Sequence, residues 1–229
     1  MKSFKTYLKD GKGEEYEARI QTGLYNAGYA VTNKTAGSSN RADGVFLHKK
    51  KEHNLEIGTT GKDFAQGKVR WRNGKWFAET KNSKTLTKFL QTLTYDDDLM
   101  DQWGPVAIGT DVESTAKDRV KAARSGGDLY LTDVPPNMIW DYYGDKGVYY
   151  IQVDGYGAFY MKRNPAKLPI PKFSVIPEIR FRVKGYGSKS SIPHDTTWAV
   201  KIPTGGMVNS AFTFDAEDTT RKGPAEFLE

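Results

Sequence analysis

The feature that most constrains the fold is a predicted β-hairpin near the start of the chain. Val45–Leu47 is a short apolar run, Lys49–Glu52 is typical of a solvated turn, and Asn54–Ile57 returns as a second strand. Asp43 precedes the first strand and Glu56 lies in the second. In an antiparallel pair the start of one strand lies opposite the end of the next, so the pattern predicts that Asp43 and Glu56 approach each other on one face.

Two carboxylates held together in this way indicate a cation site. Like charges at close range repel each other unless a cation lies between them, and oxygen ligands of this kind suit Mg²⁺, with Mn²⁺ as an alternative ion. A metal held by two carboxylates, with coordination positions left for phosphate and water, is sufficient to hydrolyse a phosphodiester.

Composition narrows the class of partner. The chain has 229 residues, a formal net charge of +6 and a pI near 9.2, which favours a polyanion such as DNA. The sequence contains no cysteine, so disulfides and thiolate metal sites are excluded. No apolar stretch long enough for a signal peptide or a membrane span occurs. These features predict a soluble, cytoplasmic protein with no membrane association.

The segments before the hairpin predict a helix, a strand and a loop. Residues 14–27 place apolar side chains at helical spacing and are followed by Gly28. Residues 29–32 read as a short strand. The small polar loop 36–41 then leads into Asp43 and would bring backbone amides close to a phosphate. The loop residues that we expect to contact DNA are Ser38, Ser39 and Arg41.

Two further regions carry basic rows on predicted strands. Residues 68–72 and 75–79 flank Asn73-Gly74, a strong signal for a tight turn, and residues 178–184 alternate basic and apolar side chains before a partner strand at 197–202. The predicted phosphate contacts are Lys68, Arg70, Arg72, Arg180, Arg182 and Lys184. The alternative is that these are half-buried ribbons whose solvent faces are merely basic.

The rest of the chain predicts one domain over residues 1–229, with a core at about 13–110 and a β-rich part at about 128–205. Residues 83–102 are expected to form an amphipathic helix, and 148–153 with 158–161 a second hairpin. The polar tail 215–229 is expected to be mobile.

Several of these residues together resemble the PD-(D/E)XK nuclease superfamily, which includes Holliday-junction resolvases and many restriction-type endonucleases. They are Gly13 and Glu17 on the first helix, the loop 36–39, Asp43 opening the hairpin and Glu56 closing it. Residues 63–67, 150–153 and 155–157 are also similar to phage-encoded endonucleases. The resemblance implies a restriction-endonuclease-like α/β fold, a central mixed β-sheet flanked by helices, and Mg²⁺-dependent cleavage of DNA.

The resemblance also implies roles for individual residues. Asp43 and Glu56 would bind the metal, joined by Glu17 directly or through water. The family motif has a lysine two residues after the glutamate, and Gly58 stands there in this chain. Lys62 could reach back from the loop to replace it, and Gln66 could orient the attacking water. Cutting both strands of a duplex calls for two active sites, which would suit a homodimer.

Three alternatives remain open on sequence alone. A competing register uses Asp63 with Glu79-Thr80-Lys81, which supplies the literal Glu-x-Lys. The chain could instead be an inactive member of the same fold that only binds DNA, as Gly58 suggests. It could also be a basic structural or interaction protein whose hairpin carboxylates occur by chance.

Overall fold

The computed structural model describes residues 12–34, 42–59, 63–72, 75–78, 129–131, 134–184, 195–201 and 207–228. The side chains of β3 and β4, and of most of β8 and β9, lie outside that description. The elements in chain order are α1 (Lys12–Asn26), β1 (Gly44–His48), β2 (Lys51–Gly58), β3 (Asp63–Arg72), β4 (Lys75–Ala78), β5 (Leu129–Leu131), α5 (Pro136–Asp145), β6 (Val148–Val153), β7 (Gly157–Tyr160), β8 (Glu178–Lys184), β9 (Asp195–Lys201) and the short 3₁₀ helix η2 (Pro224–Glu226).

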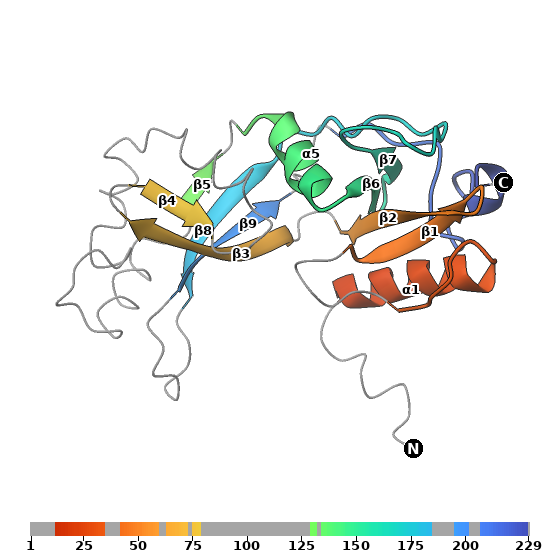
Figure 1. Cartoon of the computed structure of the whole chain (residues 1–229), viewed down its shortest axis with the longest axis horizontal. Coiled ribbons are helices and arrows are strands. Elements are labelled where there is room, and N and C mark those ends of the chain that lie inside the picture. The colour runs from red at the N-terminus through yellow and green to blue at the C-terminus, as the bar shows by residue number, and fades with distance from the viewer. Residues whose placement is uncertain are drawn as a thin grey trace, which may run out of the picture.

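Two sheets organise these elements (Figure 1). The first sheet has the order β1-β2-β6-β7 and is mixed, since β2 and β6 run parallel while the two outer pairs are antiparallel. The second sheet has the order β4-β3-β9-β8-β5, and each of its pairs is antiparallel. With α1 and α5 beside the mixed sheet, the described part of the chain is α/β, as the sequence predicts.

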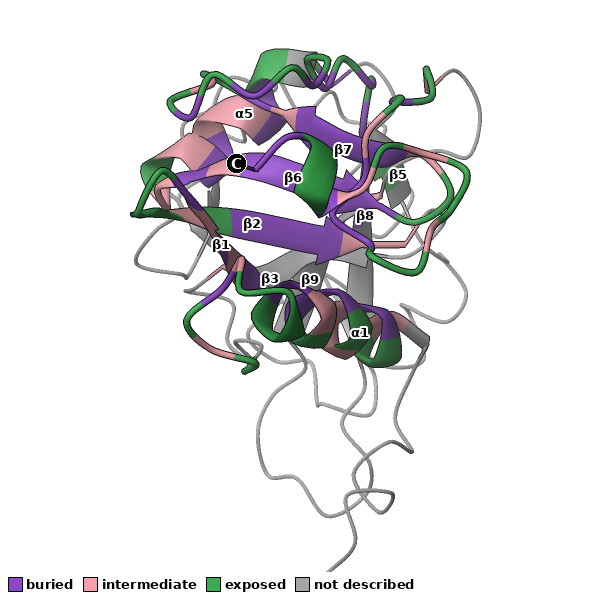
Figure 2. Ribbon diagram, turned by 90° about the vertical axis from the view of Figure 1, so that its right-hand side faces the viewer, coloured by how far each residue is buried: buried purple, intermediate pink, exposed green. Residues whose placement is uncertain are grey.

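The helices α1 and α5 lie against opposite faces of the first sheet. Side chains alternate between the two faces along β2, so this strand contacts both helices. Leu55 and Ile57 point to one face, where they join Ile20 and Leu24 of α1 in the core. Glu56 points to the other face, where Tyr143 of α5 contacts it. Figure 2 shows the buried side of α1 turned toward the sheet and its exposed side turned away.

The core on the α1 face is built from fully buried apolar side chains. Ile20, Leu24, Phe46 and Leu55 are each 0% exposed. Removing a buried side chain of this size leaves a cavity and typically costs about 2–5 kcal/mol. This packing fixes α1 against the hairpin, so the start of α1 and the open end of the hairpin are held at the same place.

The predicted hairpins are confirmed by the strand registers. β1 pairs with β2, β3 with β4 and β6 with β7, all antiparallel. The predicted pairing of residues 178–184 with the strand that follows is also found, between β8 and β9. The predicted helix at 83–102 lies outside the described residues.

Two predictions about irregular segments are wrong. Residues 29–32 do not form a strand, although the backbone amide of Leu47 donates to the carbonyl of Tyr29 at 2.6 Å. The tail 215–229 was expected to be mobile, but Phe227 and Leu228 are buried in the core. The prediction rests on the polar residues of the tail, whereas the apolar pair at its end joins the core, with Phe227 packed against Phe214.

No helix among the described residues is long and apolar enough to span a membrane.

Candidate active site

The open end of the β1–β2 hairpin brings Asp43 and Glu56 together. Gly44 pairs with Leu55, so Asp43, one residue earlier, lies directly opposite Glu56 and on the same face of the sheet. The backbone amide of Ile57 donates to Asp43 Oδ2 at 3.1 Å. This hydrogen bond holds the Asp43 carboxylate beside β2, although Asp43 itself stands just outside the strand.

Glu56 is an ionisable group placed inside the protein. Glu56 is only 6% exposed, and the Tyr143 hydroxyl donates a hydrogen bond to Glu56 Oε1 at 2.9 Å. Burial raises the pKa of Glu56 well above its ordinary value, and the neighbouring charge of Asp43 raises it further. Burial also raises the pKa of Asp43, although the hydrogen bond from the Ile57 amide lowers it in part. The two carboxyl groups therefore favour holding a proton between them when no cation is bound.

Glu17 is the third carboxylate at this end of the sheet. It lies on the first turns of α1, and its pKa is raised from 4.5 to about 8, first by burial and then by the charges of Asp43 and Glu14. The structure thus pairs Asp43 with Glu56, and Glu17 interacts with Asp43 through charge. The three residues come from three separate elements: α1, the start of β1, and β2.

Lys146 is a cation at the same place, and the sequence analysis missed it. It follows the last residue of α5, and its backbone amide donates to the carbonyls of Gly144 and Tyr143. Burial lowers the pKa of Lys146, while the charges of Glu56 and Asp43 raise it; the net direction is down. Its Nζ lies 4.2 Å from the centre of the Tyr142 ring.

The chain reaches Lys146 because β6 pairs in parallel with β2. Val148, the first residue of β6, pairs with Asn54, so the helix end just before β6 is carried to the face of β2 that bears Glu56. A sequence signal did exist, since Lys146-Gly147 directly precedes the predicted strand at 148–153. Only the parallel pairing of β6 with β2 shows that this lysine lies near β2.

The structure does not describe at this site either Lys62, proposed to replace the motif lysine, or Gln66, proposed to orient the attacking water. Lys62 lies outside the described residues. The backbone of Gln66 belongs to β3 in the second sheet, opposite Ala199, and its side chain is outside the description. The alternative register also cannot be compared, because residues 79–81 are outside the described part of the chain.

The predicted DNA-contacting residues are placed only in part. Ser38, Ser39 and Arg41 lie outside the described residues, as do the side chains of Lys68, Arg70, Arg72, Arg182 and Lys184. Arg180 is described and is 9% exposed. Arg180 is therefore largely buried and does not present the open side chain that a basic row requires; its backbone lies between Ala199 of β9 and Tyr130 of β5.

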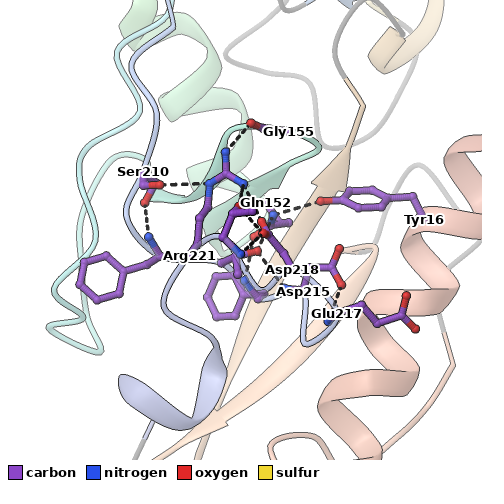
Figure 3. A network of polar contacts seen from close by, with 12 residues as sticks. Tyr16, Gln152, Gly155, Ser210, Asp215, Glu217, Asp218 and Arg221 are labelled. Carbon is purple, nitrogen blue, oxygen red and sulfur yellow. Dashed lines mark hydrogen bonds and ion pairs between the residues drawn. The ribbon is translucent and has the colours of Figure 1, made fainter.

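A buried amide fixes α1, and with it Glu17, against the sheet. Gln152 of β6 donates to the Tyr16 hydroxyl at 3.0 Å and to Thr213 Oγ1 at 3.1 Å, and its Oε1 accepts the amide of Phe214 at 2.8 Å. Figure 3 shows Gln152 between Tyr16 and the C-terminal segment. Since Tyr16 precedes Glu17, this network sets how the start of α1 meets the carboxylate end of the hairpin.

As the side chains stand, no group of three or more histidine, aspartate or glutamate residues in the described part of the chain is arranged to hold a metal ion. Asp43 and Glu56 form a pair, and Glu17 interacts with it through charge. The donor chemistry of the site is that of hard oxygen ligands, which suits Mg²⁺ or Mn²⁺. A divalent cation would also stabilise the charged form of these carboxyl groups, whose pKa values are raised first by burial.

Comparisons with known proteins give no relative from which a function could be transferred. No family model matches the sequence, no curated protein is similar to it, and no solved structure matches the fold.

Proposed function

We propose that this protein is a metal-dependent DNA endonuclease with a restriction-endonuclease-like core, and that Asp43 and Glu56 form its catalytic centre. The observation that carries the proposal is the buried carboxylate pair at the open end of the hairpin, with Lys146 acting on both members. Buried charged groups are costly, so a cluster of them with raised pKa values in one place is a functional-site candidate.

The order of the elements supports the same proposal. Along the chain, α1 and the carboxylate-bearing β1–β2 hairpin come first, and α5 and β6, which runs parallel to β2, come after β5. The resemblance to the PD-(D/E)XK superfamily implies a central mixed sheet flanked by helices, and a mixed sheet with α1 and α5 on its two faces agrees with that expectation. The second sheet takes β3, β4 and β5 from the segment between β2 and α5, and β8 and β9 from the segment after β7.

In this proposal Asp43 and Glu56 hold Mg²⁺, and Glu17 assists directly or through a water. The metal, when bound, would polarise the phosphodiester and lower the pKa of a bound water. Lys146 takes the role of the motif lysine that Gly58 does not supply: it offsets the negative charge that builds up on the phosphate during attack. Its half-buried position beside Tyr142 and Tyr143 strengthens the attraction between its charge and the phosphate, because water screens that attraction less.

Cleavage of supercoiled plasmid DNA tests the proposal. We expect Asp43→Asn, Glu56→Gln and Lys146→Gln each to lower the rate at least about 100-fold, the loss typical for one preorganised electrostatic contact. Glu15→Gln and Lys167→Gln, which change exposed residues of the same charge, should leave the rate unchanged. Parent-level cleavage by Asp43→Asn and Glu56→Gln would contradict the proposal, and Glu79→Gln then tests the second register.

The alternative of an inactive DNA-binding protein is favoured by Gly58, which has no side chain to supply the cation of the motif lysine. Its carbonyl accepts the backbone amide of Asp154. This alternative predicts salt-sensitive DNA binding with no cleavage in Mg²⁺ or Mn²⁺.

A further inference from the structure

Tyr143 makes a contact with the carboxylate pair that the proposed chemistry does not use. Its hydroxyl donates to Glu56 Oε1 at 2.9 Å, and Tyr143 is 1% exposed. A carboxylate has two oxygens and can rotate about its last bond. A fixed donor on one oxygen sets the plane of the group and leaves the other oxygen free to bind a ligand.

The donor is held rigidly by its own helix. The carbonyl of Tyr143 accepts the backbone amide of Lys146 at 3.0 Å, so the phenol and the lysine come from one helical turn. The Tyr143 ring also packs edge-on against Tyr142, with 5.1 Å between ring centres. Lys146 Nζ lies 5.3 Å from the centre of the Tyr143 ring. The end of α5 therefore supplies a hydrogen-bond donor to Glu56, and a cation that interacts with the same carboxylate through charge.

The hydroxyl also keeps its proton. Burial, then the charge of Glu56, raises the pKa of Tyr143 well above its ordinary value. Burial thus favours the neutral phenol, which is the form that donates to Glu56.

We propose that Tyr143 is a positioning residue: its hydroxyl orients the Glu56 carboxylate so that the second oxygen faces Asp43 and the divalent cation. This inference rests on the proposed function, because it assigns Glu56 as a metal ligand. Groups that orient a metal ligand in this way typically contribute about 10- to 100-fold to metal affinity.

The test compares Tyr143→Phe with a matched control, Tyr150→Phe. Tyr150 is also 1% exposed, and it lies on β6 in the sheet that contains Glu56. Its hydroxyl donates to Asn164 and accepts the amide of Ala166, so it makes no contact with the carboxylate pair in these hydrogen bonds. Both variants lose one buried hydroxyl and keep the ring. Calorimetric titration with Mn²⁺ measures metal affinity without DNA, and the ¹³C carboxyl resonance of Glu56 reports the contact in metal-free protein.

We expect Tyr143→Phe to weaken Mn²⁺ binding about 10- to 100-fold and to shift the Glu56 resonance, while Tyr150→Phe lowers stability and changes neither. In plasmid cleavage, Tyr143→Phe should raise the metal concentration for half-maximal rate more than it lowers the rate at saturating metal.

Two results would overturn the inference. If Tyr143→Phe binds Mn²⁺ within twofold of the parent while Glu56→Gln loses binding, Tyr143 is only a packing residue and the proposed function still stands. If the parent binds no Mn²⁺ at all, the proposed function fails and the positioning role fails with it, whatever the Glu56 resonance does.

Discussion

At the scale of single residues, the site is a set of carboxyl groups that prefer to be protonated. The pKa of Glu17 is raised to about 8, so the folded protein binds this proton more tightly than the unfolded chain does. The folded state is then favoured at low pH, and stability falls as the pH rises from the ordinary pKa through about 8. Raised pKa values at Asp43 and Glu56 act in the same direction.

We therefore expect the metal-free protein to have a lower melting temperature at pH 8.5 than at pH 5.5, measured by calorimetry in EDTA. In Glu17→Gln the decrease should be smaller, because one titrating group is gone, whereas the exposed control Glu15→Gln should follow the parent. An unchanged slope in Glu17→Gln would show that Glu17 titrates normally.

The second residue-scale prediction concerns Gln152, which is 1% exposed and satisfies three partners. Replacing it with leucine leaves the amide of Phe214 without its acceptor and the Tyr16 hydroxyl without its donor. We expect a loss of about 2–4 kcal/mol in the free energy of unfolding, measured with urea, because each unpaired buried group costs about 1–3 kcal/mol. Asn54→Leu, which removes an exposed amide from β2, should cost under about 0.5 kcal/mol.

At this scale, sequence reasoning found the carboxylates and missed their partners. Asp43 and Glu56 belong to one hairpin, so local spacing is enough to bring them together. Tyr143 and Lys146 come from a helix that reaches Glu56 only through the parallel pairing of β2 with β6. The local sequence around Lys146 does not predict that β6 pairs with β2.

At the scale of elements, the turn between β1 and β2 is strained. His48 pairs with Lys51, so the turn consists of Lys49 and Lys50, whose φ angles are 49° and 63°. Turns of this type favour Asn-Gly, because a side chain with a Cβ pays a steric penalty in the left-handed region. The sequence analysis identified the turn but not its backbone conformation.

Replacing the pair by Lys49→Asn with Lys50→Gly should therefore stabilise the protein by about 1–2 kcal/mol, measured by urea unfolding. Lys51→Asn, which changes a strand residue next to the turn, should give no gain. If the double variant is no more stable than the parent, the two lysines do not carry the strain that their φ angles indicate.

At the scale of the whole molecule, the C-terminal segment closes the core. Phe227 packs edge-on against Phe212 and Phe214, with ring centres 5.6 and 5.3 Å apart, and Arg19 of α1 bonds Asp215 at 2.5 Å. Sequence reasoning failed here because a short apolar pair after a polar stretch has no periodicity that distinguishes a buried end from a mobile one.

Phe227→Ala should lower the free energy of unfolding by about 3–5 kcal/mol, since it removes a buried aromatic ring from the core. Ala225→Ser, at an exposed position two residues earlier, is the control and should change stability little. Equal stability of parent and Phe227→Ala would mean that the tail is not docked in solution.

The parallel pairing of β2 with β6 also dictates when the molecule can become competent. Glu56 and Lys146 are far apart in the sequence, and their meeting must wait until β6 has joined the sheet, a long-range closure that slows assembly. A growing polypeptide that has emerged only as far as β5 would hold its acidic residues without Lys146, which follows α5. On the proposed function, an unfinished chain is harmless to the DNA around it, and cutting begins only after synthesis has passed the second helix.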